Sequence, residues 1–133
     1  MILRYKTLWY WLIVLATTWN IVLSVFAVIN SHWVLRHIAG GQMHSLSLPL
    51  RIYYFLLAIV SLAEIWFARK LIKLDGAWSF RTHRICSALT IAYGISTFVN
   101  LISRSSAERL NAPFAWMIAI GFYALSKRSA TKN

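Results

Sequence analysis

Residues 8–29 read LWYWLIVLATTWNIVLSVFAVI, and this uncharged run decides the class of fold. A helix of about 20 apolar residues crosses the ~30 Å hydrocarbon core of a bilayer. Arg4 and Lys6 precede the run and imitate the charged start of a signal peptide. The apolar stretch is too long for a signal peptide, however, and further apolar runs follow it. We therefore interpret residues 8–29 as a membrane span.

The composition of the whole chain is that of an integral membrane protein. Of its 133 residues, 59% are hydrophobic and only 13% are charged, which lies outside the usual balance of a soluble domain. The net charge of +11 comes from basic residues that flank the apolar runs, so it indicates topology rather than nucleic-acid binding. The single cysteine, Cys86, allows no internal disulfide, and no cysteine or histidine spacing predicts a metal site.

Further apolar runs predict further spans. The expected set of four lies at about residues 8–29, 50–68, 85–103 and 106–126. Ser105 and Glu108 have the spacing of a capping box, which starts the last helix inside a polar turn and leaves Pro113 in its early turns. We expect one all-α domain over residues 1–133, with four transmembrane helices in an up-down bundle.

The basic residues are distributed unevenly among the connections of this bundle. Ten of the 14 lysines and arginines lie before the first span, between the second and third spans, or after the fourth. The others, Arg36, Arg51, Arg104 and Arg109, lie on the opposite side, in the two remaining connections or at the ends of the adjoining spans. Because short cytoplasmic connections carry the excess of Lys and Arg, we expect both termini to face the cytoplasm.

Polar side chains recur along one helical face in two of the predicted spans. The third-span stripe consists of Thr90, Tyr93, Thr97, Asn100 and Arg104, and the first-span stripe of Thr17, Asn20 and Ser24. Their alternating spacings of three and four place each stripe on one side of its helix. Since a bilayer cannot hydrate these groups, both stripes are expected to face the interior. They either form interhelical hydrogen bonds that fix packing, or line a polar pathway or a small ligand pocket.

Glu64 lies inside the second predicted span, in the stretch SLAEIWFARK of residues 61–70. Counting about 1.5 Å per residue back from Arg69 places it roughly 7 to 8 Å below the cytoplasmic surface. At this depth its candidate partners are Thr90, Tyr93 and Tyr123. Three interpretations stay open: an ion pair with Arg69 or Lys70 at the surface, an ionisable group that exchanges a proton or binds a cation, or a contact with another subunit's helix.

The connection before the fourth span also carries unusual chemistry. Residues 100–116 read NLISRSSAERLNAPFAW. Glu108 is expected to cap its own helix, while Arg104 or Arg109 binds carbonyls or lipid phosphates. The pattern of Asn, Ser-x-Ser, Glu-Arg and Pro resembles a turn in small four-span bacterial membrane proteins of uncharacterised function. The resemblance implies a bacterial inner membrane and no particular activity.

No pattern in the sequence predicts an enzyme. There is no nucleophile with an adjacent base, no phosphate-binding glycine loop and no pair of carboxylates. Histidines on facing spans, which a haem would need, are missing too, so no cofactor is expected. The partners expected are the lipid bilayer, a second copy of the chain or a larger membrane protein. Two function classes remain: an accessory, regulatory or structural partner of a membrane complex, and a small oligomeric transporter or channel that uses Glu64 and the polar stripe.

Overall fold

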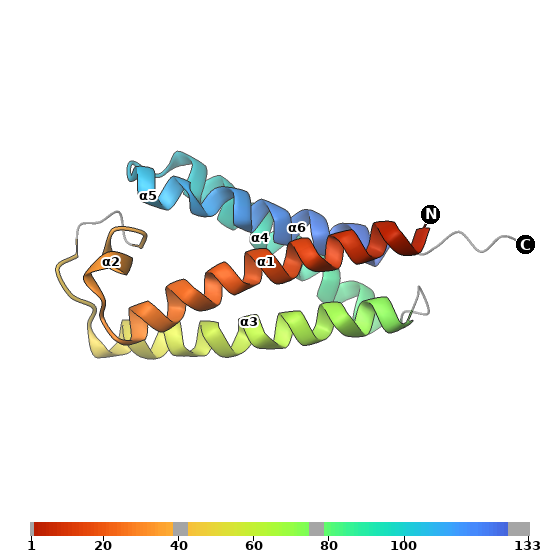
Figure 1. Ribbon diagram of the computed structural model, residues 1–133, viewed down its shortest axis with the longest axis horizontal. Helices are drawn as coiled ribbons and strands as arrows, with labels where there is room; N and C mark the ends of the chain where they lie inside the picture. Colours follow the sequence, from red (N-terminus) through yellow and green to blue (C-terminus); the bar gives the residue numbers. More distant parts are fainter. Residues whose placement is uncertain (1, 39–42, 75–78, 128–133) are drawn as a thin grey trace, which may run out of the picture.

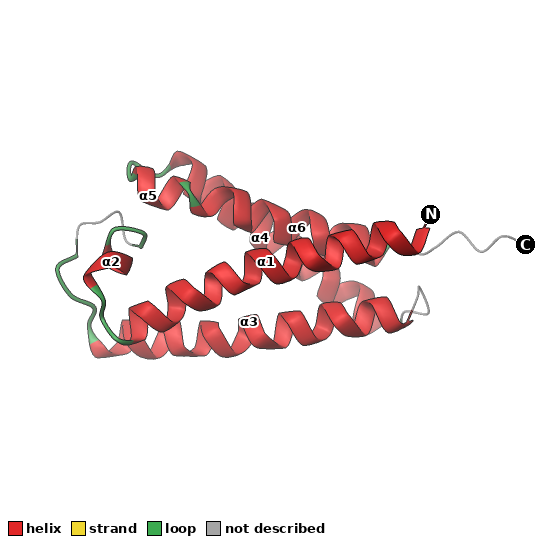
Figure 2. Ribbon diagram, viewed as in Figure 1, coloured by secondary structure: helices red, strands yellow, loops and turns green. Residues whose placement is uncertain are grey.

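The computed structural model describes residues 2–38, 43–74 and 79–127, and every regular element within these ranges is a helix. The long helices are α1 (Ile2–Val28), α3 (Leu48–Leu74), α4 (Phe80–Ile102) and α6 (Asn111–Ser126). Two four-residue helices, α2 (His32–Leu35) and α5 (Ser106–Arg109), lie in the connections (Figure 1, Figure 2). The predicted all-α fold is therefore confirmed.

The helices follow the predicted apolar runs, with one correction. The expected continuous helix over residues 106–126 is interrupted at Leu110, between α5 and α6. Pro113 explains the break, because it has no amide hydrogen for the carbonyl of Arg109 and its ring crowds that carbonyl. Ser105 still acts as the predicted N-cap: its hydroxyl accepts a hydrogen bond from the Glu108 amide at 3.4 Å.

The long helices form two pairs that are joined on one side. α1 packs along α3, and α4 packs along α6. α1 also crosses onto α6, so that it lies beside α6 near its start and beside α3 near its end (Figure 1). Among the described residues, the backbone of α4 packs against neither α3 nor α1. The space between α3 and α4 is therefore crossed by side chains alone.

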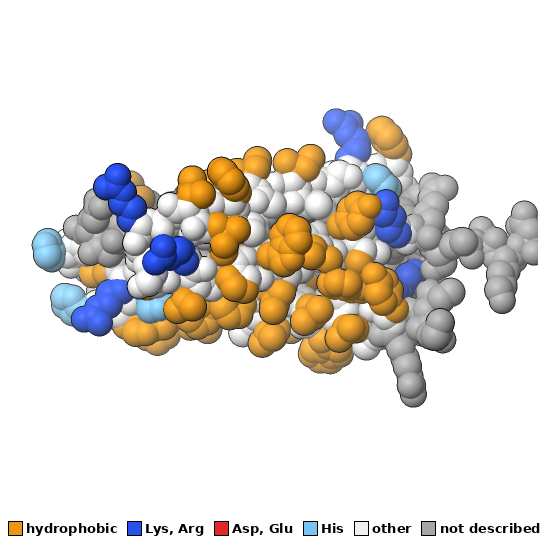
Figure 3. Space-filling model, turned by 90° about the horizontal axis from the view of Figure 1, so that it is seen from above, with side chains coloured by type: hydrophobic (Ala, Val, Ile, Leu, Met, Phe, Trp, Pro, Cys, Tyr) orange, Lys and Arg blue, Asp and Glu red, His pale blue; other side chains and the backbone are white. Residues whose placement is uncertain are grey.

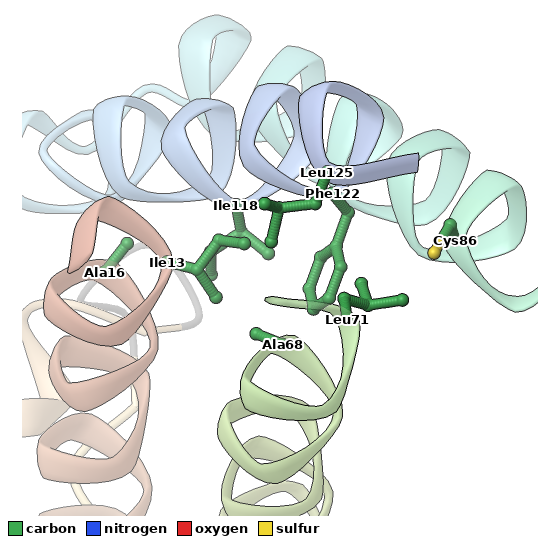
Figure 4. Close-up of a cluster of buried hydrophobic side chains, with 8 residues drawn as sticks. All are labelled: Ile13, Ala16, Ala68, Leu71, Cys86, Ile118, Phe122 and Leu125. Carbon is green, nitrogen blue, oxygen red and sulfur yellow. The ribbon is translucent and has the colours of Figure 1, made fainter. Parts of the chain in front are cut away.

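One end of the bundle, called here the packed half, holds a dense apolar core. It contains the start of α1 and the end of α6, and its buried cluster consists of Ile13, Ala16, Ala68, Leu71, Cys86, Ile118, Phe122 and Leu125. The Phe122 ring reaches from α6 toward α3 and is completely buried (Figure 4). Gly121 lets α6 approach α1 closely, since a Cβ there would lie 2.4 Å from Cγ1 of Ile13. Small residues thus hold these helices in contact at this end.

The connection between α1 and α3 lies at the opposite end. α2 folds back onto the end of α1, where Val34 and Leu35 are buried beside Leu23 and Ala27. Asn30 adopts a positive φ of 57°, a conformation that Asn tolerates better than most residues. Its Oδ1 accepts a hydrogen bond of 2.7 Å from the Leu46 amide, which ties the returning chain to the turn.

The exterior of the molecule is largely apolar, as in a protein surrounded by lipid. Figure 3 shows hydrophobic side chains over the middle of one face and Lys and Arg side chains toward both ends. Tyr5–Val28 and Phe80–Ile102 are long and apolar enough to cross a membrane. Large exposed side chains on the second of these include Ile91, Ile95 and Phe98. The length and composition of these two helices are compatible with a membrane protein.

Candidate functional site

A cavity of about 470 Å³ occupies the end of the bundle opposite the packed half, and this end is called here the cavity half. Its polar lining side chains come from every long helix and both connections: Asn20, Ser24, His37, Tyr53, Tyr54, Ser61, Tyr93, Ser96, Asn100, Glu108 and Asn111. Leu23, Ile38, Leu57 and Ala92 complete it. The cavity runs from the α2 and α5 end to Ser61, the middle residue of α3.

Glu64 lies one helical turn beyond this floor and is buried, with 5% of its surface exposed. Its carboxylate oxygens accept hydrogen bonds of 2.9 and 2.8 Å from the Tyr93 hydroxyl. Asn20 of α1 lines the same cavity as Tyr93. The Tyr93–Glu64 hydrogen bonds therefore join α4 to α3 at mid-height. Tyr93 itself faces the cavity, so it stands between the cavity and the Glu64 carboxylate.

Two of the partners predicted for Glu64 are wrong. The Thr90 hydroxyl donates to the Cys86 carbonyl of its own helix at 2.9 Å. Tyr123 is 51% exposed, and the Lys127 amino group lies 4.3 Å from the centre of its ring. Depth counting gives the height of a residue along a helix but not its direction, and Tyr123 is turned about 100° from the inward-facing Phe122.

The structure contradicts a surface ion pair between Glu64 and Arg69 or Lys70. Arg69 and Lys70 are both exposed, whereas Glu64 is buried. The Lys70 amino group lies over the ring of Trp66, 5.5 Å from its centre. The positive charges of α3 therefore remain at the surface, and the carboxylate is left inside with a neutral hydroxyl as its hydrogen-bond donor.

The polar stripe of α4 mostly lies inward, as a series of helix-internal hydrogen bonds that ends at the cavity. Thr97 is buried and donates to the Tyr93 carbonyl at 2.8 Å. Asn100 lines the cavity and donates to the Ser96 carbonyl at 2.8 Å. Arg104, expected in the same stripe, is instead exposed. α4 ends at Ile102, and the extended backbone that follows breaks the helical spacing.

The first-span stripe divides between the two halves. Asn20 and Ser24 line the cavity. Thr17, one turn nearer the packed half, is completely buried, and its hydroxyl has no hydrogen-bond partner within residues 2–38, 43–74 and 79–127. The stripe therefore leads from the cavity toward the apolar cluster and stops there.

Glu108, predicted as a capping residue, forms part of the cavity lining. Ser103 donates its hydroxyl to Oε2 of Glu108, and the Ser105 amide donates to Oγ of Ser103 at 3.2 Å. Glu108 thus binds a serine upstream of its own helix rather than returning a bond to the Ser105 amide. Arg109, at the end of α5, is exposed, as lipid or solvent contact requires.

Several cavity residues were not predicted from the sequence. Asn111 is the clearest case: it accepts a hydrogen bond of 3.0 Å from Trp19 Nε1 and donates one of 2.9 Å to the His37 carbonyl. Trp19 also stacks on Phe114, with ring centres 5.1 Å apart. Ser61 had a usable signal, because it lies three residues before Glu64 and so on the same face of α3.

Chemically, the site combines a buried carboxylate, three phenol rings and several hydroxyl and amide groups around one space. Such a set binds polar solutes by hydrogen bonds and opposite charge. Comparison with known proteins adds nothing to this description: no family model, curated protein or solved structure matches the chain.

Proposed function

We propose that this chain is a multi-pass membrane protein that binds a small polar solute inside its bundle, as the binding step of a small transporter. The observation that carries the proposal is the polar cavity, which extends from the α2 and α5 end to the centre of the bundle. The packed half, with Phe122 and Leu71 completely buried, closes the path at the other end. In this proposal the site is accessible from the α2 and α5 end and closed at the other, which is the resting arrangement that alternating access requires.

A membrane location explains why the polar side chains of this cavity need hydrogen-bond partners. α1, α3, α4 and the α5–α6 segment are taken as the four spans of an up-down bundle in a cell membrane. Serine, asparagine and tyrosine side chains at mid-membrane depth are costly unless protein or water satisfies them. Water in the cavity would form hydrogen bonds with Asn20, Ser96 and Asn100. An apolar core between the same helices could not do so.

The charge asymmetry of the sequence sets the direction of the opening. In the sequence, ten of the 14 basic residues precede the first span, lie between the second and third spans, or follow the fourth. The packed half, where α1 starts and α6 ends, is therefore assigned to the cytoplasmic side. The cavity then opens to the outer face. In a bacterial cell, which the turn at residues 100–116 favours, that is the periplasmic face of the inner membrane.

Cysteine accessibility tests both the cavity and its direction. In a Cys86→Ala background, the Ser96→Cys variant should react with a membrane-impermeant methanethiosulfonate added to intact cells. Ser96 lines the cavity, whereas its neighbour Ile95 is 61% exposed on the lipid side. The matched Ile95→Cys variant should therefore stay unlabelled, because a thiol in hydrocarbon does not ionise. Labelling of Ile95→Cys without Ser96→Cys would reject the proposal.

A second candidate is the accessory role, and the outward face of α4 favours it. This helix packs along α6 alone among the long helices, and it presents Ile91, Ile95 and Phe98 outward. A face of this kind suits lipid, a second copy of the chain or a larger membrane protein. Size-exclusion chromatography with light scattering in mild detergent separates these: stable copurification with another protein favours the accessory role, and a monomer or homo-oligomer favours the transporter.

A further inference from the structure

We propose that the solute taken by the cavity is a small organic cation, recognised through the Glu64 carboxylate and its hydrogen-bond partner Tyr93. This inference rests on the proposed function, because it names the solute class for the same cavity. It follows from the distribution of charge, the surroundings of Glu64 and the kind of side chains that line the space.

The charges around the cavity are the reverse of those of the whole protein. The chain has 14 lysines and arginines against three acidic residues. None of these basic residues belongs to the cavity lining within the described part of the chain, whereas Glu108 does. Glu64 lies directly behind the lining residue Tyr93. An anion in this space would meet Glu108 in the lining, with Glu64 behind Tyr93, and no lysine or arginine side chain of the lining.

Within the described part of the chain, Glu64 forms no ion pair, and its hydrogen-bond donor is the Tyr93 hydroxyl. Its carboxylate accepts hydrogen bonds from Tyr93, a neutral donor, while Arg69 and Lys70 remain at the surface. A buried carboxylate is costly without an opposite charge, and charges interact strongly across a medium of low polarity. A cation next to Tyr93 supplies that charge, which gives the cavity a reason to bind cations in preference to neutral solutes.

The lining favours an organic cation over a metal ion. No group of three or more His, Cys, Asp or Glu side chains among the described residues is placed to hold a metal ion. The phenol rings of Tyr53, Tyr54 and Tyr93 lie instead beside apolar Leu23 and Leu57. Aromatic faces bind ammonium groups through cation–π attraction, and the apolar side chains accommodate their carbon substituents. A volume of about 470 Å³ is suited to a ligand of small-molecule size.

Protection of the Ser96→Cys variant from labelling measures this preference. The probes are benzyltrimethylammonium, benzyl alcohol and benzenesulfonate, which share a ring and differ in charge. Benzyltrimethylammonium should slow labelling at least fivefold, and the neutral and anionic probes should not. Adding Glu64→Gln should abolish the protection while leaving the unprotected labelling rate unchanged, and Glu64→Asp should retain it. Glu108→Gln serves as the matched carboxylate control and should weaken protection less.

The outcomes separate this inference from the proposed function. Equal protection by benzyl alcohol or benzenesulfonate, or undiminished protection in folded Glu64→Gln protein, would overturn the cation assignment and leave the cavity standing. Failure of Ser96→Cys to react at all would overturn both. Should Glu64→Gln not fold, Ser61→Lys provides the second test: an ammonium one turn from Glu64 should abolish protection by the cation, and continued protection would contradict the inference.

Discussion

The packed half and the cavity half are built from the same helices but fill their interiors differently. In the packed half, Ala16, Ala68 and Gly121 bring α1, α3 and α6 close enough for Phe122 to fill the centre. In the cavity half, the α1–α3 and α4–α6 pairs lie further apart (Figure 1). There the interior consists of polar side chains around open space.

In the membrane location proposed above, the contrast has a physical reason. Hydrocarbon chains are as apolar as leucine, so burial from water would not draw the helices together, and close packing of small residues would have to do so. Where such residues are concentrated the helices meet. Where polar residues replace them, hydrogen bonds such as that from Tyr93 to Glu64 bridge the separation. Each half can be tested by removing what holds it.

The largest effect is expected from Phe122→Ala in the packed half. Phe122 is completely buried among three helices, and its removal leaves a hole that the neighbours fill only in part. We expect a loss of about 3 kcal/mol in the free energy of unfolding, at the lower end of the range for such substitutions because lipid reduces the transfer contribution. Thermal unfolding in detergent with lipid would measure it.

Leu57→Ala is the matched substitution in the cavity half. Leu57 already faces open space, so shortening it creates little new void, and the expected loss is below about 1 kcal/mol. Equal losses for the two variants would mean that the interiors of the two halves do not differ as described.

The sequence predicted the long helices because its apolar runs have helical length and are bounded by polar connections. It also predicted Tyr93 as a neighbour of Glu64, because equal depth on facing helices brought both to the same level. It failed for Tyr123, whose height was suitable but whose direction was not. The break at Leu110 was missed as well, although Pro113 carried the signal for it.

The cavity could not be predicted from the sequence in the same way. Its existence depends on the separation of the two helix pairs, which long-range contacts such as Gly121 against Ile13 determine. The polar stripes indicated which faces lie inside, and they fitted interhelical hydrogen bonds as well as a pocket. Only the positions of the backbones distinguish the two.

Gly121→Ala should have the next largest effect. A Cβ at this position would lie 2.4 Å from Cγ1 and 2.9 Å from Cδ1 of Ile13, so α6 and α1 must separate. Overpacking of this kind costs about 2 kcal/mol. The control is Gly94→Ala in α4, where an added Cβ has no atom within 4 Å. That variant should be neutral or slightly stabilising through better helix propensity, as the same unfolding measurement would show.

A displacement of α6 in Gly121→Ala should also change the shape of the cavity half. Widening at Gly121 changes the angle at which the two helix pairs separate, so the labelling rate of Ser96→Cys should also change in Gly121→Ala. An unchanged rate together with lost stability would show that the packed half does not control the separation of the pairs.

A smaller effect than that of Gly121→Ala is expected at the bridge between α3 and α4. Tyr93→Phe keeps the ring but removes the donor to both Glu64 oxygens, leaving a buried carboxylate without it. The expected loss is about 1 kcal/mol, at the low end for an unsatisfied buried group because water in the cavity can replace the hydroxyl.

Glu64→Gln should cost less than Tyr93→Phe, since the glutamine side-chain oxygen still accepts from Tyr93 and carries no charge. The double variant should then be no less stable than Tyr93→Phe alone, because the glutamine also removes the charge that the phenylalanine left unsatisfied. Additive losses would instead show that Tyr93 and Glu64 act separately, and the bridge would no longer explain how the cavity half is held together.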